Sequence, residues 1–90
     1  MSAEAVSWAF GARGIRPREK LALIWLANNE MGEWKCLFDL GDLATVCCCK
    51  PVKAVAIIEA LEAAGLIRVS VGGALADRMT AALRPGGWRP

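Results

Sequence analysis

The residues with the most reactive side chains in this sequence are its four cysteines, Cys36 and the contiguous run of residues 47–49. Thiols at suitable spacing bind metals, form disulfides or act as nucleophiles. Here no C-x-x-C pair occurs, and adjacent cysteines rarely meet disulfide geometry. The chain also lacks histidine, so no Cys-His or Ser-His nucleophile can be assembled. We expect reduced thiols, no enzymatic activity, no metal and no cofactor, with Cys47 and Cys49 packed near a turn and Cys48 exposed.

Basic side chains are the second group with binding chemistry, because lysine and arginine contact phosphate. The net charge is only +2, so affinity for nucleic acid has to come from local clusters. From residue 68 onward the charged residues are four arginines and one aspartate, which makes the C-terminal part basic. A second cluster, at residues 13–20, either meets a phosphate backbone or is a solvated surface; it consists of Arg13, Arg16, Arg18 and Lys20.

Tryptophan side chains stack on bases in proteins that bind single strands, and this chain has four of them. We expect Trp8, Trp25 and Trp34 to pack in the core instead, since Trp25 lies on an apolar helical stripe. Trp88 belongs to a Gly/Pro-rich segment, residues 85–90, and is the one we expect to be available to a partner.

Ninety residues are enough for one domain, which we place at residues 1–84, followed by a flexible tail at 85–90. Residues 2–10 are predicted to form a short helix. Pro17 suits the first turn of a core helix that ends near residue 28, and residues 34–38 then form a short strand. The predicted buried stripes of the two helices are Val6, Ala9 and Phe10 in the first, and Leu21, Ile24, Trp25 and Asn28, widened by Leu23 and Leu26, in the second.

Two further helices are bounded by capping signals. Asp39 is expected to cap a short helix that runs to about Cys47. Pro51 opens the next helix and Gly65 closes it, since proline favours the first helical position and glycine the left-handed position beyond the end. The buried face of this helix is predicted to comprise Ala54, Ile58 and Leu61, flanked by Ile57.

The last third of the chain alternates as strands do. Residues 66–71 are rich in branched side chains, Gly72 and Gly73 read as a turn, and residues 79–84 alternate like a return strand. A helix is the alternative there, because Leu75, Met79 and Leu83 also recur every four residues. The expected fold class is therefore α+β, mainly helical: a winged helix-turn-helix of three core helices and a C-terminal β-hairpin wing, with the helix-turn-helix at residues 43–67.

Several short motifs, in this order, resemble the helix-turn-helix domains of phage replication and regulatory proteins, and the similarity covers residues 5–71. They are Ala5-Val6-x-Trp8-Ala9-Phe10, Arg16-Pro17-x-x-Lys20-Leu21, Leu43-Ala44 and Glu62-x-Ala64-Gly65-Leu66-Ile67. The resemblance implies a winged helix whose third core helix, residues 51–64, enters the DNA major groove. This sequence departs from the family in the turn, where Cys48 takes the usual glycine position and Lys50 the cap.

Two sets of residues follow as candidate contacts. Lys50 and Lys53 near the start of the third core helix, and Arg68 and Arg78 on the wing, are expected to touch phosphate. The outward face of that helix carries Val52, Val55, Ala56 and Glu59, whereas direct readout of bases needs hydrogen-bond donors and acceptors.

Two hypotheses follow. The first is a small phage-type winged-helix regulator that binds double-stranded DNA. The alternative is a protein-binding inhibitor that uses the outward apolar face against a host protein or nucleoprotein complex, such as a phage anti-defence (anti-CRISPR) protein; a homodimer also stays open. We expect a cytoplasmic protein of a bacterial or phage-infected cell without membrane contact, because no apolar run reaches the roughly 20 residues of a membrane span.

Overall fold

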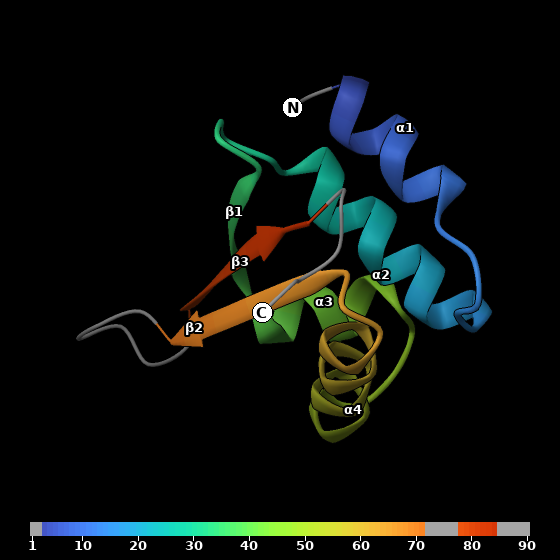
Figure 1. The fold of residues 1–90 in the computed structure, drawn as a ribbon. Coiled ribbons are helices and arrows are strands. Elements are labelled where there is room, and N and C mark those ends of the chain that lie inside the picture. Colours follow the sequence, from blue (N-terminus) through green and yellow to red (C-terminus); the bar gives the residue numbers. More distant parts are fainter. Residues whose placement is uncertain (1–2, 72–77, 85–90) are drawn as a thin grey trace.

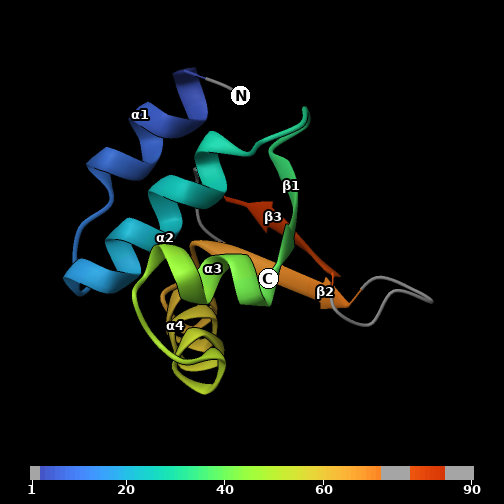
Figure 2. The same ribbon diagram turned by 180° about the vertical axis from the view of Figure 1, so that it is seen from behind.

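The computed structural model describes residues 3–71 and 78–84, which form a small, mainly helical α+β fold. In Figure 1, α1 lies along α2, the sheet lies on the other side of α2, and α4 lies below. Figure 2 shows from behind that α3 leads from the end of β1 toward α4, and α3 contacts both. The elements in chain order are α1 (Ala3–Gly11), α2 (Pro17–Asn28), β1 (Lys35–Asp39), α3 (Leu40–Val46), α4 (Pro51–Ala63), β2 (Ile67–Val71) and β3 (Arg78–Leu83).

The strands form one antiparallel sheet in the order β1-β3-β2. The last strand of the chain is therefore central, and Ala81 of β3 lies opposite both Cys36 and Val69. A return strand is confirmed over residues 78–83, where the helical alternative is wrong, and the predicted short strand is confirmed as β1. Residues 72–77, with the predicted glycine turn, and the predicted tail at 85–90 lie outside the described residues.

Local signals at the helix starts explain where these elements begin. The Asp39 carboxylate accepts hydrogen bonds from the backbone N–H groups of Gly41 at 2.7 Å and Asp42 at 3.2 Å, as predicted for a cap. Proline occupies the first turn of α2 and of α4. Gly65, with φ of +76°, follows the end of α4 in the left-handed conformation that favours glycine.

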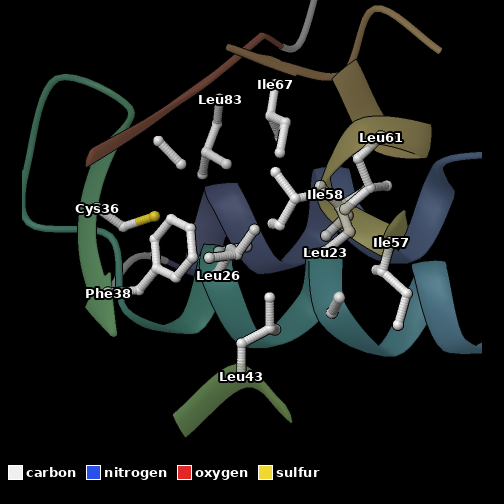
Figure 3. Packing of buried hydrophobic residues seen from close by; sticks show 14 of the residues in the cluster. Leu23, Leu26, Cys36, Phe38, Leu43, Ile57, Ile58, Leu61, Ile67 and Leu83 are labelled. Carbon is white, nitrogen blue, oxygen red and sulfur yellow. The ribbon is translucent and has the colours of Figure 1, made fainter. Parts of the chain in front are cut away.

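The core lies between α2, α4 and the inner face of the sheet (Figure 3). Leu23 and Leu26 of α2 point toward Ile58 of α4, and Phe38 of β1 lies beside Leu26. The predicted buried face of α4 is confirmed, and the neighbouring strands supply buried side chains at alternate positions. Burial of these side chains, each worth about 1.5–3 kcal/mol, is what holds the short elements together. The largest fully buried residues are Leu23, Leu26, Leu43, Leu61, Ile67, Leu83 and Cys36.

Three tryptophans pack against the core as predicted. Trp8 of α1 meets Trp34 edge to face, with ring centroids 5.7 Å apart. Trp25 of α2 meets Phe38 in the same way at 6.4 Å. These contacts tie α1 to the segment before β1 and α2 to the sheet.

The predicted buried stripes of α1 and α2 are wrong in part. Phe10 is 62% exposed and Val6 is half-buried, whereas Ala9 is buried against α2 as predicted, together with Ala5 one turn earlier. On α2, Leu21 and Asn28 are exposed, and Ile24 and Trp25 are half-buried. The fully buried positions are Ala22, Leu23, Leu26 and Ala27. In both helices small alanines allow a neighbouring backbone to come close, so the close-packed face is centred on alanine.

Within residues 3–71 and 78–84, no helix has the length and apolar character that crossing a membrane requires.

Candidate nucleic-acid interface

The outward face of α4 is an exposed strip of small and apolar side chains. Val52 is 76% exposed and Val55 39% exposed, and Ala56 and Glu59 are exposed as well. These residues lie where the spacing predicted them, about half a turn from the buried Ala54. The strip offers methyl groups along most of its length and a single carboxylate at Glu59.

The turn before α4 contains the three contiguous cysteines. Cys47 is buried, Cys48 exposed and Cys49 half-buried, as predicted. Cys48 has φ of +54°, a left-handed conformation that L residues adopt at a cost. The Cys49 N–H donates to the carbonyl of Ala44 at 3.0 Å, which closes the turn between α3 and α4.

Lys50 and Lys53 lie at the start of α4, and both are exposed. The carbonyl of Lys50 accepts hydrogen bonds from the backbone N–H groups of Lys53 at 2.9 Å and Ala54 at 3.1 Å, which fixes the first turn. The two ammonium groups therefore extend from an ordered helix start. A positive charge near the N-terminus of a helix interacts unfavourably with the helix dipole, so neither lysine stabilises α4 through its charge.

A groove of about 550 Å³ separates α4 from the start of α2. Arg16, just before α2, and Arg18 of α2 line one side, and Lys53 of α4 lines the other, so three cations surround one hollow. One acidic side chain, Glu19, also lines it, and its carboxylate accepts a hydrogen bond from the Arg16 N–H at 3.0 Å. The apolar part of the wall consists of Pro17, Ala56, Ile57 and Ala60.

The groove brings together residues from two groups in the sequence analysis. Arg16 and Arg18 belong to the basic cluster at residues 13–20, whose role stayed open, and Lys53 is a predicted phosphate contact. Arg16 and Arg18 were visible only as a basic run, and nothing in their spacing indicated that they would face α4. Lys20, from the same run, has a different role: its ammonium donates to the carbonyls of Phe10 and Ala12 at the end of α1. Lys20 thus serves the fold, whereas Arg16 and Arg18 are exposed beside α4.

Arg68 lies on the opposite flank of α4. The Val69 N–H, next to Arg68 on β2, donates to the Glu62 carboxylate at 3.1 Å, so the Glu62 side of α4 faces β2. Glu62 and Lys53 are separated by about two and a half turns and project from opposite sides of the helix. Lys53 and the strand that carries Arg68 therefore lie on different sides of α4. Arg78 begins β3 opposite Asp39, and its side chain lies outside the described part of the chain.

Two of the four thiols, those of Cys36 and Cys47, are buried and lack the features of a reactive site. Burial raises the pKa of the Cys36 thiol to about 11, against a smaller lowering effect of a backbone hydrogen bond from Ala81. Burial likewise raises the pKa of Cys47. Both thiols stay protonated at neutral pH, where a nucleophile or ligand would be a thiolate. No cluster of three potential metal ligands occurs among the residues that the structure describes.

A second hollow, of about 360 Å³, lies between α2, β1 and the start of α3. Its charged groups are Asp39 and Asp42, and the Asp39 carboxylate is already engaged as the cap of α3. An acidic lining repels phosphate. The basic groove beside α4 is therefore the better candidate for a nucleic-acid contact. Comparison of the chain with known protein families, with curated proteins and with solved structures finds no match.

Proposed function

We propose that this protein is a small phage-type winged-helix regulator that binds double-stranded DNA, with α4 in the major groove. The convergence of Arg16, Arg18 and Lys53 on the groove beside α4 carries the proposal. An α-helix with its side chains is about 10–12 Å wide, and the major groove is about 12 Å wide. Cations along one side of an inserted helix would then lie against a phosphate backbone.

The element order supports the winged-helix interpretation. Helices α3 and α4 are joined by a short turn, and strands β2 and β3 follow as an antiparallel pair that would form the wing. Cys48 stands where the resembled phage domains typically have glycine, and its positive φ is the conformation that glycine favours. At this position the chain therefore differs from the resembled domains in residue type, but its backbone has the conformation that glycine favours.

Binding to DNA is tested by fluorescence anisotropy with a labelled mixed-sequence duplex at several salt concentrations. Up to four cations, Arg16, Arg18, Lys50 and Lys53, would neutralise phosphates. We therefore expect the affinity to fall about a hundredfold between about 50 and 200 mM salt. Failure to bind the duplex at low salt would contradict the proposal.

A matched pair of variants locates the contact. Lys53→Ser should reduce the slope of log K against log salt by about 1, because one phosphate contact is lost. Lys35→Ser removes the same charge from an exposed position on β1 and should leave the slope unchanged. Equal effects of the two substitutions would mean that net charge, and not the groove, governs binding.

The exposed apolar strip of α4 favours a second candidate, a protein-binding inhibitor such as an anti-CRISPR protein. An apolar residue as exposed as Val52, bordered by charges, is typical of a protein interface. Capture of a partner from nuclease-treated bacterial lysate should then be lost with Val55→Glu and kept with Leu37→Glu. Capture that depends on intact DNA would instead favour the first candidate.

A further inference from the structure

The composition of the α4 strip limits what it can recognise. The side chains of Val52, Val55 and Ala56 are exposed and consist only of methyl and methine groups. Most edges of the bases in the major groove carry hydrogen-bond donors and acceptors, and covering them with methyl groups leaves them unpaired at a cost. The C5-methyl group of a pyrimidine is the apolar feature of that groove, and it is a favourable partner for aliphatic side chains.

The charges around the α4 strip also fit duplex DNA, with the apolar face of the helix against the bases. On the groove side, three cations, Arg16, Arg18 and Lys53, outnumber the one acid, Glu19, whereas the β2 side carries Arg68 together with Glu62. Positive charge is therefore concentrated on one flank, as expected for a helix that leans against one phosphate backbone while its apolar face meets the bases.

Glu59 is compatible with this arrangement. It lies three residues beyond Ala56 on the exposed side of α4. Phosphate would repel its carboxylate, but the groove floor offers the amino groups of adenine and cytosine as donors. An adenine paired with thymine supplies such a donor next to the methyl group.

We propose that α4 selects duplex DNA that carries C5-methylated pyrimidines, thymine or 5-methylcytosine, through Val52, Val55 and Ala56. The inference rests on the proposed DNA binding and names the feature of the DNA that the helix recognises. Selection of the methylated base then arises from apolar contact, with Glu59 as the one hydrogen-bonding group and without an arginine or glutamine on the reading face.

Base analogues that differ by one methyl group test the inference. Anisotropy titrations would compare an A·T-rich duplex with the same duplex containing deoxyuridine in place of thymine. A second pair would compare a G·C duplex with its 5-methylcytosine counterpart. We expect affinity to fall on removal of the methyl group and to rise on its addition, by about fourfold for each methyl group contacted.

The double variant V52S/V55S connects the effect to α4. It removes two of the three proposed contact residues, so it should lose most of the affinity difference between thymine and deoxyuridine duplexes and keep its salt dependence. Leu37→Ser is the control, since Leu37 and Val55 are each 39% exposed, and it should retain the difference. Equal affinity of the natural protein for thymine and deoxyuridine duplexes, with salt-dependent binding to both, would overturn the inference and leave the proposed function standing. Absence of binding to every duplex would overturn both.

Discussion

Cys36 is a buried thiol of β1 with no exposed surface. Burial raises its pKa from 9.0 to about 11, and the nearby Glu30 carboxylate adds to the rise. Above pH 9 the thiol of the unfolded chain loses its proton while that of the folded chain keeps it. The free energy of unfolding should therefore fall as the pH increases from about 9 to about 11, by on the order of 2 kcal/mol.

Urea denaturation of the natural protein and of Cys36→Ala across this pH range measures the effect. The variant should lose less stability between pH 9 and 11, because the other titrating groups are common to both proteins. Parallel pH profiles would show that Cys36 does not have the raised pKa.

Single residues differ in how well the sequence indicated their surroundings. The outward position of Val52 and the inward position of Ile58 followed from helical spacing, because both belong to one helix with a clear apolar side. The partners of Lys53 did not follow, because Arg16 and Arg18 come from a distant segment and meet it only when α2 packs near α4. Arg68 was grouped with Lys53 by charge, yet its strand, β2, lies on the Glu62 side of α4, opposite Lys53.

The turn between α3 and α4 is the element whose geometry decides how α4 is presented. In this turn the backbone of Cys48 has a left-handed conformation, which glycine adopts without strain and β-branched residues strongly resist. We expect Cys48→Gly to be more stable than Cys48→Val by about 1–2 kcal/mol in urea denaturation.

Thr45 provides the control for this comparison. It is exposed and lies within α3, where glycine is the less favourable residue. Thr45→Val should therefore be more stable than Thr45→Gly, the reverse of the order at residue 48. Valine more stable than glycine at both positions would mean that the turn does not need a left-handed residue.

Elements were predictable where capping and periodicity agreed. The Asp39 cap, the proline starts and Gly65 fixed the bounds of α3 and α4 closely. The buried face of α2 was not predictable from periodicity, because residues 21–27 are apolar all round and several neighbours compete for them. The pairing of β1 with β3 was also hidden, since strand order depends on tertiary packing.

For the whole molecule, charge distribution matters more than total charge. A net charge of +2 is too weak to attract DNA over long distances, so any binding depends on the place where cations gather. Among the described residues, three cations line the groove between α2 and α4, beside the exposed face of α4. This arrangement makes α4 the expected contact surface.

The most direct test is a map of the surface that duplex DNA touches. In 15N-labelled protein, adding a short duplex should shift the backbone amide resonances of Arg18, Lys53 and Val55 by NMR. The amides of Lys35 and Leu37, on the outer side of β1, should stay unchanged. Shifts concentrated on β1 with α4 unaffected, or no shifts at low salt, would contradict the claim that α4 and its basic groove bind DNA.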